Sequence, residues 1–127
     1  MDGDVWRVKV HRLADPDMRQ LKATYPDEFA DMIDALKALS TCGNIFDVRF
    51  PLDTCLTYPD ADDCVRFKKR GQIWRVILRV IHRGLHVTPT ADMRPCEDTY
   101  LQIIFVDDRG NRTYDALRLR VLDMVRG

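Results

Sequence analysis

The stretch "VRFKKRGQIWRVILRVIHRG", residues 65–84, holds seven Lys or Arg and no acidic residue. Its apolar side chains fit two kinds of secondary structure. A helix would gather Trp74, Ile77, Leu78 and Ile81 on one face, and a strand would gather Trp74, Val76, Leu78 and Val80. Five of the nine residues from 73 to 81 are β-branched, and such stiff side chains favour the strand.

The same stretch contains its own turn. Arg70, Gly71 and Gln72 interrupt it where a tight connection would join "VRFKK" to "IWRVILRVIH", so we expect a β-hairpin. Arg75 and Arg79 would then share one strand face. A membrane-surface helix is disfavoured because its basic residues do not separate cleanly from the apolar arc. A localisation signal at "KKR" is disfavoured because the flanking residues have the pattern of ordered structure.

Length and composition predict a single globular domain. The chain has 127 residues, of which 46% are apolar and 31% charged, so we expect one domain, residues 1–127, with one core. No apolar run approaches the roughly 18 residues of a membrane span. The acidic start "MDGDVWRV" leads directly into a strand-like run and argues against a signal peptide. We therefore expect a cytoplasmic protein without a membrane partner.

Charge is unevenly distributed along a chain whose formal net charge is zero. Residues 1–63 carry 13 acidic and 7 basic side chains, a net of −6, and residues 64–127 carry 7 acidic and 13 basic, a net of +6. This asymmetry predicts an anionic partner for the second half, with nucleic acid as the first candidate. The alternative is that the acidic half neutralises the basic half within one fold.

The cysteines and histidines form no metal-binding pattern. They are Cys42, Cys55, Cys64, Cys96, His11, His82 and His86. No CxxC pair occurs, and the histidines do not stand at zinc-ligand spacings from the cysteines. We expect reduced thiols and neither a metal nor another cofactor. A redox clip between Cys55 and Cys64, which flank "LTYPDADD", stays open.

The N-terminal third predicts a strand and then a helical pair. "VWRVKVH" (5–11) has apolar residues at period two, which indicates a strand with one buried face. A short helix follows, with Asp15 as N-cap, Pro16 at the first helical position and Asp17 in the first turn. A second helix begins near Pro26 and ends at Gly43. Its apolar face consists of Phe29, Met32, Ile33, Leu36 and Leu39. Residues 15–42 thus form two helices or one kinked helix.

The remaining segments are read as follows. "NIFDVRF" (44–50) alternates as a strand does, whereas "LDTCLTYPDADD" (52–63) and "RGLHVTPTADMRPCED" (83–98) predict loops. "TYLQIIFVDD" (99–108) has the composition of a central strand. "TYDALRLRVLDMVRG" (113–127) is ambiguous, because Leu117 and Val121 fit a helical face, while alternation with Leu119 fits a strand. The order predicts an α+β fold, with the helical pair on one face of a small, largely antiparallel twisted sheet. The other face is expected to be free.

This order, with the basic hairpin in it, resembles the RelE/ParE toxin superfamily of bacterial toxin–antitoxin systems, and most of all the RelE-like messenger-RNA endoribonucleases. "DCVRFKKRGQIWRVILRVI" is similar to the family's central hairpin, a basic strand and turn followed by an aromatic, an Arg and an aliphatic strand. "IIFVDDRGNRTYDALRLRVL" is similar to its last core strand, followed by an Arg and a late Tyr. The likeness covers about 75 residues of sequence pattern.

The resemblance implies a RelE-like, microbial RNase-like fold that cleaves ribosome-bound mRNA through the RNA 2′-OH without metal. It also implies a cognate antitoxin as partner, with a homo-oligomer or a toxin–antitoxin hetero-oligomer as the assembly. By position, the catalytic residues are Lys68, Arg75, Arg109 and Tyr114. The RNA- and phosphate-binding residues are Arg66, Arg70, Arg79 and Arg112, of which Arg112 is also the rival of Arg109.

The chemistry of RNA cleavage gives these residues roles. The 2′-OH must lose a proton, the departing 5′-oxygen must gain one, and the charge at phosphorus must be stabilised. Lys68, among other cations, is the expected base, and Arg75 with Arg109 is the expected planar clamp on the phosphate. Tyr114 would stack on a base or orient the nucleophile. The group that protonates the leaving oxygen stays open.

Other residues are expected to be structural. Trp74 is expected in the core, and Lys69, on the opposite parity from Lys68, is expected to be a solvated charge. His82 and His86 have no evident carboxylate partner.

Two other functions stay open, because the neutral net charge and the long 83–98 loop depart from the family pattern. One is a non-catalytic ParE-like toxin that binds a protein target such as gyrase. The other is an unrelated small nucleic-acid- or protein-binding domain. Convergence of the four catalytic candidates on one open sheet face would favour the endoribonuclease.

Overall fold

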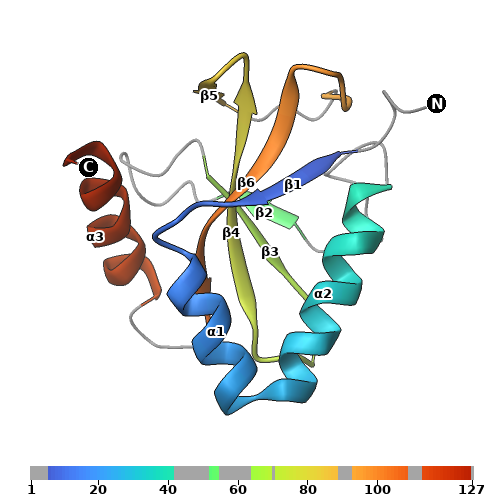
Figure 1. The fold of residues 1–127 in the computed structure, drawn as a ribbon, viewed down its shortest axis with the longest axis vertical. Coiled ribbons are helices and arrows are strands. Elements are labelled where there is room, and N and C mark those ends of the chain that lie inside the picture. The colour runs from blue at the N-terminus through green and yellow to red at the C-terminus, as the bar shows by residue number, and fades with distance from the viewer. Residues whose placement is uncertain are drawn as a thin grey trace.

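The computed structural model describes residues 6–41, 52–54, 64–69, 71–88, 93–108 and 113–126. The chain begins with β1 (Arg7–Val10), α1 (Asp15–Thr24) and α2 (Pro26–Ser40). The strands that follow are β2 (Leu52–Thr54), β3 (Cys64–Lys68), β4 (Arg75–His82), β5 (Leu85–Val87) and β6 (Thr99–Asp107). The last element is α3 (Thr113–Arg126). Figure 1 shows the strands crossing between the helices. The predicted α+β class is confirmed.

The strands form one mixed sheet in the order β1-β6-β4-β3-β2, and β5 pairs with the end of β4 off this path. β1 runs parallel to β6, and the other described pairs are antiparallel. β6 and β4 form the centre, and their side chains are almost entirely buried. The central position predicted for residues 99–108 is thus confirmed.

The predicted hairpin is present as β3 and β4. Lys68 lies opposite Arg75, and the register continues to Cys64 opposite Arg79. Gly71 in the connection has φ +86, a backbone conformation that glycine adopts without steric cost. Trp74 and Phe67 are fully buried with ring centroids 5.4 Å apart. Trp74 is therefore a core residue, as expected.

The helical pair covers one face of the sheet. Leu21 of α1 and Met32, Leu36 and Leu39 of α2 belong to the core cluster that contains the β3 and β4 side chains on this face. α1 begins one residue earlier than predicted, because Ala14 takes the cap position without a side-chain hydrogen bond. Asp15 instead pairs with Arg19 one turn later.

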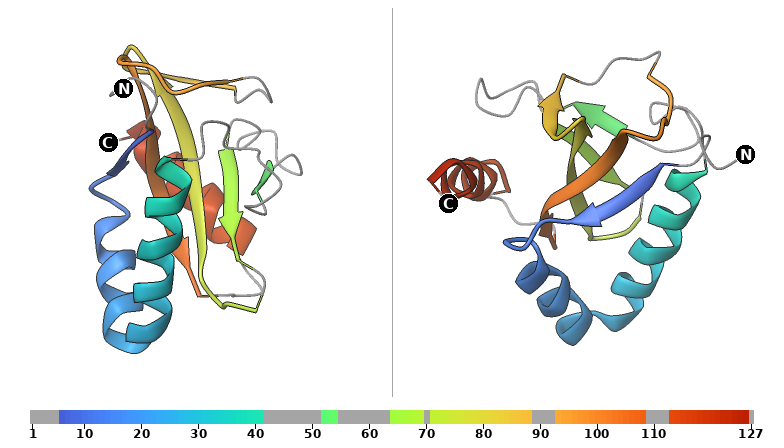
Figure 2. Two further views of the ribbon diagram at one scale, coloured as in Figure 1. Left: turned by 90° about the vertical axis from the view of Figure 1, so that its right-hand side faces the viewer. Right: turned by 45° about the horizontal axis from the view of Figure 1, so that its top comes forward.

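The opposite face is not free, which corrects the expectation. α3 packs there through Leu117 and Val121, which join a second core cluster. The sheet residues of that cluster are Cys64, Ile77, Ile104 and Phe105. A β-bulge opposite Ile77 and Leu78 adds one residue to β6, so that neighbouring residues 104 and 105 both face α3. Figure 2 shows α3 apart from α1 and α2.

Two further expectations are corrected. The segment 52–63 begins with the short strand β2, and the 83–98 segment contains β5. Each strand has only three residues, too few for a pattern at period two to stand out. The strand predicted for 44–50 and the helix end at Gly43 lie outside the described residues, as do Cys42 and Cys55. Cys64 and Cys96 are thiols rather than disulfide partners.

Among the described residues, no helix combines the length and apolar character needed to cross a membrane.

Candidate functional site

The basic residues of the hairpin lie on one face of the sheet. Arg66 and Lys68 lie two residues apart on β3, and Arg75 and Arg79 lie four residues apart on β4. Lys68 lies opposite Arg75 in the register of the two strands. Since directly opposed residues point to the same side of a sheet, all four side chains face the side on which α3 packs. We call this side the basic face. Sequence parity predicted this arrangement for Arg75 and Arg79.

One end of the basic face holds a row of three charged residues across three strands. Lys68 of β3 lies opposite Arg75 of β4, and Arg75 lies opposite Asp107 of β6. All three side chains are partly buried. Directly opposed like charges such as Lys68 and Arg75 destabilise a sheet. The row therefore places two positive charges side by side, with a carboxylate on the next strand.

Farther along the basic face, Arg79 of β4 is buried. It stands between Cys64 of β3 and Gln102 of β6, and only 8% of it is exposed. Arg66 is in the intermediate position, opposite Ile77. The Arg79 end of the basic face is thus buried, whereas Lys68 and Arg75 at the other end are partly exposed.

Arg120 fixes α3 to the rest of the fold. Its guanidinium donates to both carboxylate oxygens of Asp17 in α1, at 2.8 and 3.2 Å, and to the carbonyl oxygen of Ile104 at 3.1 Å. The ring of Phe105 lies 5.3 Å from its carbon Cζ. Asp17 also accepts from the backbone N–H of Val106 at 3.2 Å. This junction sets the position of α3 on the basic face.

His11 extends the parallel pairing of β1 with β6. Its N–H donates to the carbonyl oxygen of Ile103 at 2.8 Å. His11 lies two residues after Lys9, which is opposite Gln102, and Gln102 is opposite Arg79. His11 is therefore on the basic face, near the bulge in β6. From the sequence, His11 was weighed only as a zinc ligand. Its alternation with Arg7 and Lys9 was the available signal.

The electrostatics around His11 favour its neutral form. Burial, and then the positive charges of Arg12, Arg120 and Arg79, lower the pKa of His11 below its usual value. Its Nδ1 accepts a hydrogen bond from the N–H of Leu13 at 3.1 Å, so the proton of the neutral ring lies on Nε2. His11 is thus an uncharged donor close to several arginines.

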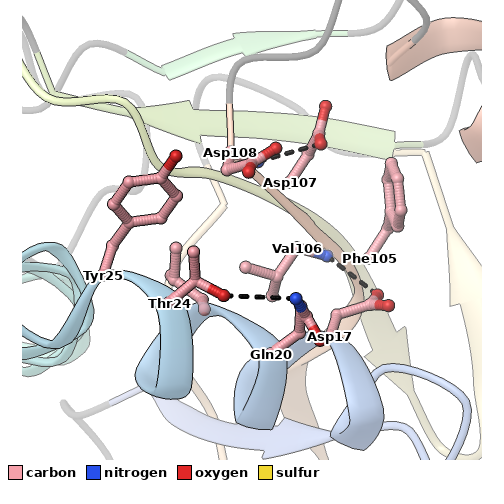
Figure 3. Close-up of a pocket in the computed structure, with 9 residues that line it drawn as sticks. Asp17, Gln20, Thr24, Tyr25, Phe105, Val106, Asp107 and Asp108 are labelled. Atoms are coloured by element: carbon pink, nitrogen blue, oxygen red, sulfur yellow. Dashed lines mark hydrogen bonds between the residues drawn. The ribbon is translucent and has the colours of Figure 1, made fainter.

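A cavity of about 210 Å³ lies between α1 and the end of β6, next to the charged row. Asp107 and Phe105 line it from the sheet, and Gln20, Thr24 and Tyr25 line it from α1 and its end. Figure 3 shows Tyr25 and Asp107 on different sides of this cavity. Tyr25 is 41% exposed. The carboxylates of this cavity suit amino groups and hydroxyls rather than phosphates.

The turn end of the hairpin is attached to α2. Asp31 accepts from Nζ of Lys69 at 2.9 Å and from Nε1 of Trp74 at 2.8 Å, and Glu28 accepts from the N–H of Ile73 at 3.1 Å. The hydrogen bond from Lys69 is the main cause that lowers the pKa of Asp31 below its usual value. Lys69, expected to be only a solvated charge, is therefore a contact to α2.

The other predicted site residues are not all described. Arg70, Arg109 and Arg112 lie outside the described residues, and Tyr114 is in the first turn of α3 with its side chain outside them. The structure therefore brings together Arg66, Lys68, Arg75 and Arg79. It adds His11 and Asp107, which sequence analysis did not place with them.

Within the described part of the chain, no group of three or more His, Cys, Asp or Glu side chains could hold a metal ion. Comparison of the sequence and structure with protein-family models, curated proteins and solved structures finds no match.

Proposed function

We propose that the protein is a RelE-like toxin, a metal-independent endoribonuclease that acts in the cytoplasm on ribosome-bound mRNA and is neutralised by a cognate antitoxin. The supporting observation is the direct opposition of Lys68 and Arg75 on the basic face. An arginine provides a planar, bidentate contact to a phosphate, and an adjacent lysine adds a point charge. RNA is the partner class that supplies repeated phosphates with a 2′-OH beside each.

In the proposed reaction, each step of cleavage through the 2′-OH is assigned to a side chain of the charged row. Arg75 holds the phosphate and stabilises its developing charge, and Lys68 takes the proton of the 2′-OH. Asp107, across from Arg75, is the further candidate for proton transfer. The cavity beside the charged row accepts a base, with Tyr25 as a stacking surface at its side.

The experiment is regulated expression in a bacterial host, followed by mapping of mRNA ends with and without translation. The variants are Arg75→Ala, Arg75→Lys and, as matched control, Arg19→Ala, whose side chain is exposed on α1. We expect growth arrest with ribosome-dependent cleavage for wild type and Arg19→Ala. Arg75→Ala should lose at least about 100-fold in cleavage rate. Arg75→Lys should not restore it, because a lysine cannot make the bidentate contact.

Other outcomes would overturn the proposal in distinct ways. Growth arrest with intact mRNA would favour a ParE-like toxin that binds a protein target such as gyrase. An absence of toxicity would favour the third function, an unrelated nucleic-acid- or protein-binding domain. Cleavage that survives in Arg75→Ala would show that the basic face does not take part in the reaction.

A further inference from the structure

A second group of reactive side chains lies at the opposite end of β4 from Arg75. His82 ends β4 and lies directly opposite Thr99, the first residue of β6. Cys96 precedes Thr99 by one turn and is exposed. Figure 1 shows this end of β4 beside the start of β6, far from the turn of the β3–β4 hairpin. His82 lies seven positions after Arg75 along β4, about 23 Å at the usual strand rise.

The three side chains form a continuous hydrogen-bonded chain. Oγ1 of Thr99 lies 2.8 Å from Sγ of Cys96 and 2.8 Å from Nδ1 of His82. Thr99 is only 4% exposed, so water has little access to the hydroxyl in the middle. A hydroxyl donates one proton and accepts others. It therefore accepts from the thiol while donating to the imidazole, or accepts from the imidazolium while donating to the thiolate.

The backbone holds this chain in place from both sides. The N–H of Thr99 donates to the carbonyl oxygen of Cys96 at 3.1 Å, and the N–H of Arg83 donates to that of Asp98 at 3.0 Å. The guanidinium of Arg7 donates to the carbonyl oxygen of Glu97. The sheet register fixes His82 against Thr99. The donor and acceptor atoms are thus positioned before any reagent arrives, which lowers the cost of a proton shift.

We infer that Cys96 is a nucleophilic thiol and a modification site for small disulfides of the glutathione type, with Thr99 relaying its proton to His82. The thiolate is the reactive form of a cysteine, and the relay produces it together with imidazolium. Cys64, by contrast, is fully buried beneath α3 and is closed to such a reagent.

The exchange step balances without an additional oxidant. The Cys96 thiolate attacks one sulfur of glutathione disulfide, a new S–S bond forms, and the old S–S bond breaks. One glutathione leaves as a thiolate and takes up the proton that the Cys96 thiol had given to the relay. The products are a mixed disulfide on Cys96 and one reduced glutathione. Cys96 is exposed, so glutathione disulfide can approach it and be attacked in line with its S–S bond.

The test is the rate of mixed-disulfide formation at Cys96 in the full chain, with glutathione disulfide as the reagent and peptide mass spectrometry as the readout. Thr99→Val and His82→Gln each interrupt the relay and should slow the reaction about tenfold or more near pH 7. Thr99→Ser keeps a hydroxyl and should react as wild type does. His86→Gln, a change of an exposed histidine on β5, is the matched control. Cys96→Ser should remove the signal.

A pH series separates the relay from a purely structural role. At strongly alkaline pH every accessible thiol is ionised, so the rates of Thr99→Val and His82→Gln should converge with that of wild type. Circular dichroism should first show that both variants are folded. Equal rates for wild type, Thr99→Val and His82→Gln near pH 7 would overturn the inference. A deficit that persists at alkaline pH would also overturn it, because it would indicate altered access rather than proton transfer.

Discussion

At the scale of single residues, His11 shows how neighbouring charges select a protonation state. Its ring is partly buried, and Arg12, Arg120 and Arg79 all act against an additional positive charge. The hydrogen bond from Leu13 to Nδ1 would have to break on protonation, since that nitrogen would then carry a proton. A neutral imidazole that donates through Nε2 can bind a phosphate oxygen or an alkoxide without adding to the local charge. His11 is thus a candidate for a neutral hydrogen-bond donor to a phosphate oxygen, and not for the acid that protonates the leaving oxygen.

The same pKa shift predicts a pH dependence of stability. The pKa of His11 is lowered in the folded state, so the unfolded chain takes up a proton first as the pH falls below about 6.5. The free energy of unfolding should therefore fall from pH 7 to pH 5, and His11→Gln should reduce this fall. Urea denaturation at closely spaced pH values measures it. At pH 8 the ring is neutral in both the folded and the unfolded state. The difference in the free energy of unfolding between wild type and His11→Gln at that pH therefore reports packing alone. An equal pH dependence in both proteins would contradict the prediction.

Residue-level prediction from sequence succeeded where a side chain's position follows from its own strand. The alternation of Arg75 and Arg79 with Trp74 was visible in the sequence, and Trp74 is buried as expected. His11 and Asp107 reach the basic face only through the pairing of β1 with β6 and of β6 with β4. The first pairing joins residues 93 positions apart, such as Arg7 and Tyr100, and the second joins Arg75 to Asp107, 32 positions away. No local pattern specifies the register of either pairing. The bulge in β6 also changes which residues face α3.

At the scale of elements, α3 shows why a short apolar pattern can be ambiguous. Leu117, Leu119 and Val121 satisfy a strand at period two, and Leu117 with Val121 satisfies a helix. In the structure Leu117 is fully buried, whereas Leu119 is 62% exposed, which is the helical outcome. The second apolar surface of the sheet, with Ile77 and Phe105, provides the burial that favours it. That surface could not be recognised before the strand pairing was known.

The ion pair of Asp17 with Arg120 joins three elements, α1, β6 and α3, and should contribute measurably to stability. Both side chains are largely buried, at 17% and 18% exposure, and Asp17 also accepts from Val106. Loss of hydrogen bonds to charged groups in such a place costs about 2 kcal/mol. We expect Arg120→Ala to lower the free energy of unfolding by that amount in urea denaturation.

A matched comparison is available in α1. Arg19 pairs with Asp15 one turn away, with exposures of 79% and 49%, and exposed pairs of this kind contribute less than about 0.5 kcal/mol. Arg19→Ala should therefore change the free energy of unfolding by much less than Arg120→Ala does. Similar losses for the two variants would show that the junction at Asp17 does not hold α3 in place.

At the scale of the whole molecule, the acidic and basic halves of the chain are folded together rather than separated. α2 supplies Asp31 and Glu28 to the turn end of the basic hairpin, and α1 supplies Asp17 to α3. Internal pairing, the alternative considered from composition, thus accounts for part of the asymmetry. Lys68 and Arg75 remain partly exposed on the basic face. With a formal net charge of zero, attraction of an anion depends on this face rather than on the field of the whole protein.

This charge distribution predicts a shallow salt dependence of RNA binding, provided that the proposed function holds. If Arg66, Lys68 and Arg75 contact about three phosphates of a single strand, the slope of log K against log salt concentration should be about −2. Arg75→Ala should make the slope less negative by about 0.7, because one phosphate contact is lost. Arg19→Ala, on the helical side of the fold, should leave the slope unchanged. Fluorescence anisotropy with a labelled single-stranded RNA over a range of salt concentrations measures both. A slope that changes equally in the two variants would show that the RNA contacts the protein without preference for the basic face.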